Sequence, residues 1–282
     1  MKTNPVPSIS PLKHKDYKSG YKPVWCPGCG DFGVLNALVK ALAALSLPPE
    51  QVAFVAGIGC SSRIPAYTSA YGFHGVHGRA LPLASGLAIA RPDLTVLVAG
   101  GDGDGFSIGG NHFLHACRRN VDLTYLVMDN AVYGMTKGQA GPTCEPDWAG
   151  SRLTPVGPGQ DAFRPLEIAL AAGAPYIARA FSNDSNELAR MIAEAIEFPG
   201  FAFIQILSPC ITFRPEQMGY KKRVHAGFRA TNDRGQAFAD LMEDDGFTTG
   251  LLYRAEREPY QSAEANGKVS LQEIAAEFQV PE

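Results

Sequence analysis

The sequence LTVLVAGGDGDG occupies Leu94–Gly105, and LTYLVMDN occupies Leu123–Asn130. Each stretch opens with a run of β-branched and other apolar residues, which predicts a strand buried on both faces. Each run then gives way at once to small, acidic or amide residues. Two further apolar runs, Gln51–Ala56 and Phe201–Leu207, also predict strands and are followed by glycine or by Ser-Pro.

Helix-forming segments alternate with these strands. We expect helices over Gly33–Leu45, Pro82–Ala90, Gly109–Arg118 and Ser185–Phe198, with Asp31 capping the first and Asn183 or Asp184 the last. A shorter strand, Tyr176–Ala180, precedes the last helix. This alternation predicts an α/β fold with a doubly wound parallel sheet.

The composition is that of an ordinary globular protein. Of the 282 residues, 45% are apolar and 19% are charged, and 25 basic against 28 acidic residues give a net charge of −3. A pI near 6.1 without basic runs argues against nucleic-acid binding. No apolar run is long enough to span a membrane. The polar, proline-containing N-terminal segment lacks the apolar core of a signal peptide, so we expect a cytoplasmic protein.

Three parts of the chain differ in pattern. We expect an N-terminal extension over residues 1–24, one ligand-binding domain over 25–215 and an irregular C-terminal arm over 216–282. The arm carries more charge and only weak helical patterns, such as Leu271–Phe278. It is expected to pack on a partner subunit; the alternative is a partly disordered tail.

Glycines and acidic residues follow two of the strands, where parallel α/β sheets bind ligands. Successive glycines in Gly101–Gly105 allow backbone N–H groups to cradle a phosphate. Asp102 and Asn130 supply oxygen ligands of the kind that Mg²⁺ accepts beside phosphate. The pattern predicts a diphosphate held through Mg²⁺, the alternative being a glycine-rich turn with a capping aspartate. Phe106 stands where an EF-hand loop needs its next ligand, which excludes that site.

Two of the six cysteines are expected at the same edge, and two more form a close pair. Cys26 and Cys29 share a WCPGC turn, whereas Cys60 and Cys210 follow predicted strands. Cysteines clustered in a reducing compartment bind metal or act in redox chemistry more often than they form disulfides. A [4Fe–4S] cluster is favoured over zinc because the second CxxC pair of a zinc ribbon is missing. A thioredoxin-type dithiol is disfavoured because no strand precedes the CxxC segment.

Other residues imitate functional motifs. The segment Gly28–Gly33 has the form GxGxxG, but it has no preceding strand and it contains a candidate ligand cysteine, so we reject a dinucleotide fingerprint. His77 is a candidate functional residue, because the nearby Arg79 suits binding of an anion. Four residues have no expected function: Cys117, Cys144, His112 and His115.

Ordered sequence blocks resemble a known family between Trp25 and Arg214. The GDG…DN pair resembles the thiamine diphosphate motif. Together with WCPGCG, GIGCSSR, YGFHGVHGRA, GDGDGFSIGGNHF and DNAVYGMTKGQ, it is similar to the β subunits of 2-oxoacid:ferredoxin oxidoreductases, and to the 2-oxoglutarate branch in particular.

The resemblance implies an activity. This is coenzyme A-dependent oxidative decarboxylation of 2-oxoglutarate, or the reverse carboxylation, with electrons passing through a [4Fe–4S] cluster to ferredoxin. Alternatives are a pyruvate:ferredoxin oxidoreductase β subunit, a non-catalytic iron–sulfur electron-transfer subunit and an acetolactate synthase-like carboligase without a cluster. The glutamate that activates thiamine belongs to a pyrimidine-binding domain, which the chain lacks. The resemblance therefore implies an α subunit, with the cofactor at the interface of an (αβ)2 assembly.

The resemblance also implies roles for individual residues. It makes Cys26, Cys29, Cys60 and Cys210 ligands of one [4Fe–4S] cluster, and Asp102, Asn130 and the carbonyl of Val132 ligands of Mg²⁺. It lines the thiamine diphosphate site with Ile58, Gly59, Cys60, Ser61, His77, Gly78, Arg79, Ala80, Gly103, Asp104, Gly134 and Met135. The candidate catalytic residues are His77 and Lys137, which would lie near the substrate.

Overall fold

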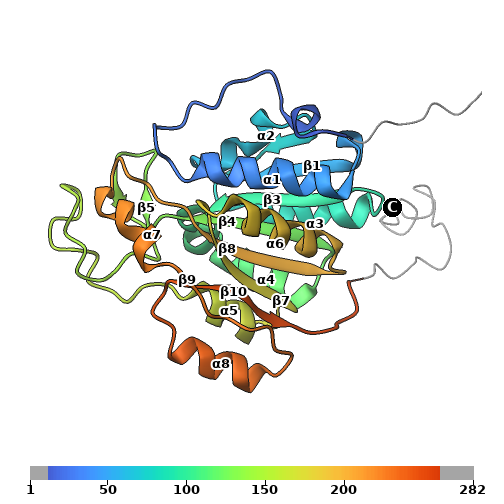
Figure 1. The fold of residues 1–282 in the computed structure, drawn as a ribbon. Coiled ribbons are helices and arrows are strands. Elements are labelled where there is room, and N and C mark those ends of the chain that lie inside the picture. Colours follow the sequence, from blue (N-terminus) through green and yellow to red (C-terminus); the bar gives the residue numbers. More distant parts are fainter. Residues whose placement is uncertain (1–11, 261–282) are drawn as a thin grey trace, which may run out of the picture.

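A computed structural model describes residues 12–260. Its centre is an eight-stranded sheet with the order β2-β1-β3-β4-β8-β7-β10-β9 (Figure 1). The strands are β1 Val52–Ala56, β2 Tyr71–His74, β3 Thr95–Gly101, β4 Leu123–Asp129, β5 Val132–Tyr133, β6 Gln139–Ala140, β7 Tyr176–Phe181, β8 Phe201–Leu207, β9 His225–Ala226 and β10 Thr248–Arg254. The helices are α1 Asp31–Leu45, α2 Ile64–Tyr67, α3 Ala80–Ala90, α4 Gly110–Arg119, α5 Pro165–Ala171, α6 Ser185–Glu197, α7 Tyr220–Arg223 and α8 Arg234–Met242.

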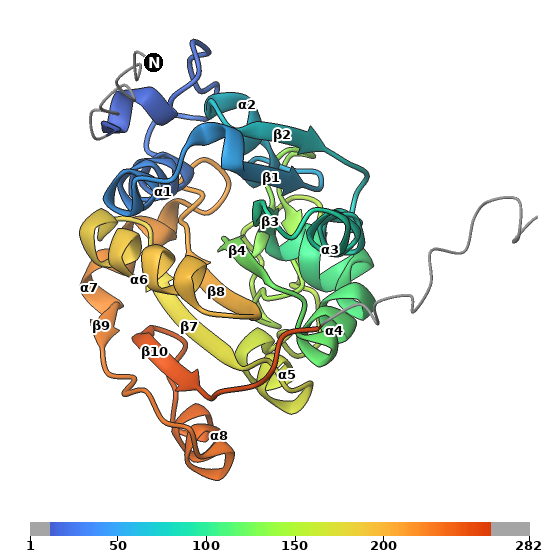
Figure 2. The same ribbon diagram turned by 90° about the vertical axis from the view of Figure 1, so that its right-hand side faces the viewer.

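The sheet is parallel from β2 through β7, which confirms the predicted fold class. Figure 2 shows α1 and α6 on one face of the sheet and α3, α4 and α5 on the other. The carboxyl ends of β1, β3, β4 and β8 therefore meet at one edge of the sheet. The glycines and acids singled out above follow these ends, as do Cys60 and Cys210.

Burial on both faces explains the continuous apolar runs. All residues of β1, β4 and β8 are buried. Neighbouring residues of a strand point to opposite faces, so Phe54 belongs to the core beneath α1 and α6 while Val55 belongs to the other core. Likewise, Leu126 belongs to the core beneath α1 and α6, and Val127 belongs to the core on the other face.

The helix boundaries agree with expectation within about three residues, but one cap does not. Asp31 is the first residue of α1 and Gly30 is its N-cap, so the expected Asp31 cap is wrong. The Asp31 carboxylate instead accepts a hydrogen bond from Ser208 Oγ at 2.8 Å, across to the loop after β8. Asp184 does cap α6, accepting from the backbone N–H of Glu187.

The described part of the C-terminal arm is more regular than expected. It contains α8, and β10 extends the sheet as an antiparallel partner of β7 with a register shift between Leu251 and Tyr253. This shift and the left-handed φ of 133° at Gly250 interrupt the alternation by which a strand is read from sequence. The weak helical pattern at Leu271–Phe278 lies outside the described residues. Among residues 12–260, no helix combines the length and apolar character needed to cross a membrane.

Candidate functional site

A cavity of about 230 Å³ lies where the loops after β1, β3 and β4 meet. Its lining residues are Ile58, Gly59, Cys60, Ser61, His77, Gly101, Asp102, Gly103, Asp104, Met128, Asn130, Val132, Tyr133, Gly134, Met135 and Thr136. Most of these were predicted from the sequence to line one site. Met128, Tyr133 and Thr136 were not. Their only signal was that they lie within two residues of predicted site residues.

Asp104 organises three walls of this cavity. Its Oδ1 accepts hydrogen bonds from the backbone N–H of Ile58 at 2.9 Å and of Gly78 at 2.8 Å, and lies 2.8 Å from His77 Nδ1. The carboxylate is 3% exposed, so these contacts replace its hydration. A side chain at Gly57 would collide with this carboxylate, which explains the glycine there. Asp104 thus ties the end of β1 and the turn before α3 to the loop after β3.

Four predicted site residues, Gly78, Arg79, Ala80 and Lys137, are not among the residues that line the cavity. Arg79 is the N-cap residue of α3, and its guanidinium donates to the carbonyls of Gly78 and Ile108. Ala80 begins α3 and is buried. Lys137 is exposed and has a left-handed φ of 85°, directly after the lining residue Thr136. Such backbone strain in a non-glycine residue is typical of functional loops.

Acidic and amide oxygens gather at one end of the cavity. Asp102 is 2% exposed, and burial together with the charge of Asp129 holds the pKa of its carboxyl well above the usual range. Thr143 Oγ1 lies 3.4 Å from Asp102 Oδ2, and no described lysine or arginine pairs with Asp102. The neighbouring buried carboxyl groups of Asp102 and Asp129 suit a hard cation, because its positive charge compensates the negative charge that burial disfavours.

The loop after β4 is held in a strained shape. Ala131 has a left-handed φ of 57°. Its N–H donates to Asp129 Oδ1 at 3.2 Å, and its carbonyl accepts from the N–H of Gly141 at 3.0 Å. Asn130 Oδ1 accepts from the N–H of Val132 at 3.1 Å, closing an Asx turn that places this oxygen beside the cavity. These contacts offset the cost of the left-handed residue.

The four predicted cluster cysteines converge next to the cavity. The CxxC turn docks on the loop after β8: the N–H of Gly30 donates to the carbonyl of Pro209 at 3.0 Å. A methyl group at Gly134 would lie 3.5 Å from Cys210 Sγ and 4.0 Å from Cys60 Sγ, so both sulfurs flank one point of the cavity wall. All six cysteines are free thiols.

The electrostatics of these thiols call for a positive partner. Burial, Asp31 and the neighbouring Cys210 and Cys26 raise the pKa of Cys60 to about 11. Burial and Asp31 raise the pKa of Cys29 further, with Cys60 and Cys210 contributing. The sulfurs therefore disfavour one another's thiolate form, which a positive charge would stabilise. Among the described residues, no three His, Cys, Asp or Glu side chains are placed to bind a single metal ion.

The residues assigned no function lie elsewhere. Cys117 is buried in the core beneath α3 and α4, and burial raises the pKa of its thiol. Cys144 lies against Arg214 Nη1 in the loop after β6. His112 and His115 lie on α4, and neither lines the cavity.

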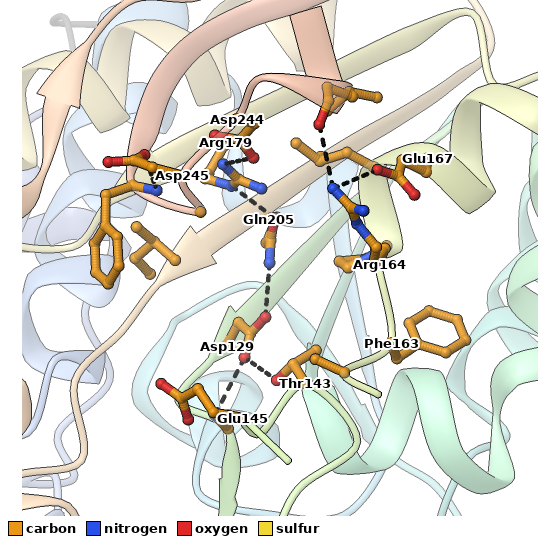
Figure 3. Close-up of a pocket in the computed structure, with 18 of the residues that line it drawn as sticks. Asp129, Thr143, Glu145, Phe163, Arg164, Glu167, Arg179, Gln205, Asp244 and Asp245 are labelled. Atoms are coloured by element: carbon orange, nitrogen blue, oxygen red, sulfur yellow. Dashed lines mark hydrogen bonds and ion pairs between the residues drawn. The ribbon is translucent and has the colours of Figure 1, made fainter. Parts of the chain in front are cut away.

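A second, larger cavity of about 350 Å³ lies at the same edge of the sheet (Figure 3). A relay of buried side chains crosses it. Thr143 Oγ1 and Gln205 Nε2 donate to the Asp129 carboxylate at 2.6 and 2.7 Å. Arg179 donates to Gln205 Oε1 at 2.8 Å and to Asp244 Oδ2 at 2.7 Å. The relay connects the loop after β4 with the segment before β10.

Comparisons with known proteins bear on this site. Residues 57–206 match the family described as "Thiamine pyrophosphate enzyme, C-terminal TPP binding domain". The chain is 46% identical over 203 residues to 2-oxoglutarate oxidoreductase subunit KorB of Mycobacterium tuberculosis, covering 72% of this chain and 54% of the relative. It is 40% identical over 227 residues to 2-oxoglutarate synthase subunit KorB of Methanothermobacter thermautotrophicus, covering 79% and 78%.

A solved structure is similar over almost its whole length. It is the 2-oxoglutarate:ferredoxin oxidoreductase from Magnetococcus marinus with 2-oxoglutarate, coenzyme A and succinyl-CoA bound. The TM-score is 0.87 at 40% identity, covering 95% of this chain and 97% of that chain. The match spans only about half of the Mycobacterium tuberculosis relative and 64% of subunit beta of the Aeropyrum pernix 2-oxoacid:ferredoxin oxidoreductase 2. The fold, the cavity and these likenesses agree with the sequence blocks: the chain belongs to the family of 2-oxoacid:ferredoxin oxidoreductase β subunits.

Proposed function

We propose that the chain is the β subunit of a 2-oxoglutarate:ferredoxin oxidoreductase. The reaction is the coenzyme A-dependent oxidative decarboxylation of 2-oxoglutarate to succinyl-CoA, or its reverse, with electrons leaving to ferredoxin. The observation that carries the proposal is Cys60, which lines the cavity and also belongs to the cysteine group. One residue thus joins the site of bond cleavage to the site of electron transfer.

The 230 Å³ cavity would hold one part of a thiamine diphosphate molecule, its diphosphate end. The diphosphate would lie against Gly103 and His77, at the end of the cavity that Asp102 lines. Mg²⁺ would be held there by Asp102, Asn130 Oδ1 and the Val132 carbonyl. When bound, thiamine diphosphate supplies the electron sink for loss of the 2-oxoacid carboxylate. The chain binds and orients it, and Asp104 keeps the surrounding loops in place.

The cysteine group fits a [4Fe–4S] cluster. Cys26, Cys29, Cys60 and Cys210 would be its ligands, each as a thiolate. Because Cys60 Sγ and Cys210 Sγ both flank Gly134, the cluster would lie against the cavity wall. This proximity suits electron transfer out of the cavity. A reducing compartment such as the cytoplasm would keep these thiols available as ligands.

A partner must complete the site. No glutamate lines the cavity within the described part of the chain, whereas thiamine activation requires one at the aminopyrimidine. An α subunit with a pyrimidine-binding domain would supply it, in an (αβ)2 assembly. The 216–282 arm would contribute to that contact.

Substrate choice is tested by kinetics. The candidates are 2-oxoglutarate and pyruvate, and the names of the similar proteins favour the former. A longer substrate brings a second carboxylate that needs a cationic partner, and exposed Lys137 beside the cavity is a candidate. The α–β complex should give a higher kcat/KM with 2-oxoglutarate, whereas a ratio favouring pyruvate would reassign the substrate. Purified complex without thiamine diphosphate would instead favour a non-catalytic iron–sulfur subunit.

A further inference from the structure

Gln217 connects the two proposed cofactor sites. It lies on a short 3₁₀ helix, Pro215–Gly219, and is 1% exposed. Its Oε1 accepts from the backbone N–H of Cys210 at 2.8 Å, and its Nε2 donates to the carbonyl of Asn130 at 2.8 Å. A backbone donor on one side and a carbonyl on the other fix the orientation of the amide.

On one side, Gln217 supports the strained loop after β4. The carbonyl of Asn130 belongs to the peptide that leads into Ala131, whose φ is 57°. Asp129 holds the N–H of this peptide and Gln217 holds its carbonyl, whereas Gly141 holds the carbonyl of Ala131. Without Gln217, a partly buried carbonyl loses its partner and the peptide is held from its N–H side alone. Asn130 Oδ1 and the Val132 carbonyl would shift with it.

On the other side, Gln217 closes the turn that carries Cys210. The N–H of Arg214 donates to the carbonyl of Cys210 at 2.8 Å, so the segment folds back on the cysteine. The backbone of Thr212 and Phe213 lies close to the Cys210 sulfur. Hydrogen bonds to ligand sulfurs are among the factors that set the potential of an iron–sulfur cluster.

We propose that Gln217 is a positioning residue that fixes the cluster-ligand loop at Cys210 relative to the magnesium loop at Asn130. This inference rests on the proposed function, since it assumes a cluster and a divalent cation at those loops. One side-chain amide then sets the spacing between the electron acceptor and the metal-held diphosphate.

The surrounding fold does not depend on this amide alone. The same segment is anchored by Arg214, whose guanidinium contacts Glu145 Oε2 at 2.7 Å and Glu216 Oε1 at 2.9 Å. It also lies 4.5 Å from the centroid of the Trp148 ring. We therefore expect Gln217 variants to fold, with their effects confined to the two loops.

The test uses the α–β complex purified without oxygen. After removal of divalent cations, Mn²⁺ is titrated and the free ion is counted by EPR, since Mn²⁺ accepts the oxygen ligands of Mg²⁺. A dye-mediated redox titration gives the midpoint potential of the cluster. Gln217→Met keeps the side-chain length and removes both backbone contacts, together with the hydrogen bond that Nε2 donates to the Tyr220 hydroxyl at 3.1 Å. We expect Mn²⁺ affinity to fall roughly five- to tenfold, as for loss of a buried hydrogen bond, and the midpoint potential to shift.

Two further variants make the result decisive. Gln217→Glu keeps an acceptor for the Cys210 N–H but sets an oxygen against the Asn130 carbonyl, so Mn²⁺ affinity should fall again and the added charge should make the potential more negative. This polar variant also decides the matter if Gln217→Met does not fold. Gln236→Met on α8, whose exposed side-chain amide donates to half-buried Asp240, should change neither measurement.

The outcomes separate the inference from the proposed function. The bridging role is overturned if folded Gln217 variants keep the wild-type Mn²⁺ affinity and cluster potential. It is also overturned if Gln217→Met alters only the affinity or only the potential. Either result leaves the proposed function intact. A wild-type complex without a cluster or without a Mn²⁺ site would overturn the proposed function itself, and the bridge with it.

Discussion

Asp104→Asn tests how the cavity is built. The substitution keeps the shape of the side chain but removes the negative charge that two buried N–H groups now face. Hydrogen bonds to charged groups contribute about 1.5–3 kcal/mol and neutral ones about 0.5–1.5 kcal/mol, so each loses roughly 1 kcal/mol. The His77 contact adds little, because that side chain is 38% exposed. We expect a total loss of about 2–3 kcal/mol in the free energy of unfolding.

Urea unfolding followed by the fluorescence of Trp25 and Trp148 measures this loss. The midpoint should fall while the slope stays unchanged, since the same surface is exposed on unfolding. Binding of thiamine diphosphate should weaken as well, because the Ile58 and Gly78 segments are no longer held.

Asp240→Asn is the matched control. Its carboxylate accepts a hydrogen bond from Gln236 at the surface of α8, so the free energy of unfolding should change by no more than about 0.5 kcal/mol. If Asp104→Asn unfolds at the same urea concentration as this control, Asp104 does not organise the cavity as we describe.

Three further predictions concern the loops around the cavity. Cys210→Ala should remove the visible absorbance of the cluster and Cys117→Ala should keep it; normal iron content in the former would remove the four-cysteine assignment. Asp102→Ala should lose Mg²⁺ and bind thiamine diphosphate weakly, with Asn130→Ala milder because it removes a neutral ligand; unchanged occupancy, measured by metal and cofactor analysis, would move the diphosphate elsewhere. Arg179→Met should cost about 3–5 kcal/mol in urea, because its buried carboxylate partner is left without a cation; a cost below about 1 kcal/mol would contradict the relay.

The site was predictable where chemistry follows directly on a strand. Asp102, Asn130 and Cys60 each lie at or just after the carboxyl end of an apolar run, so a parallel sheet alone brings them together. The CxxC pair was predictable from the cysteine spacing. Its position beside Cys210 was expected from the family resemblance, and the structure explains it through the Gly30–Pro209 contact.

Other features carried no readable signal. β2 is fully exposed at the sheet edge and contains Gly72, so it lacks the apolar run by which the other strands were identified. Gln217 is an ordinary polar residue in a charged, proline-containing segment, and only tertiary packing gives it two backbone partners. Asp104 was predicted to line the cavity, but its contacts with distant N–H groups depend on how the loops fold together.

Substrate-driven reduction of the cluster tests the central claim most directly. The chain is combined with its α subunit without oxygen, 2-oxoglutarate and coenzyme A are added, and visible absorbance and EPR are recorded. We predict bleaching and the EPR signal of a reduced cluster in the complex, and neither in the isolated chain nor in a complex carrying Cys210→Ala. Turnover by the isolated chain, or turnover by the complex while its cluster stays oxidised with no acceptor present, would contradict the account.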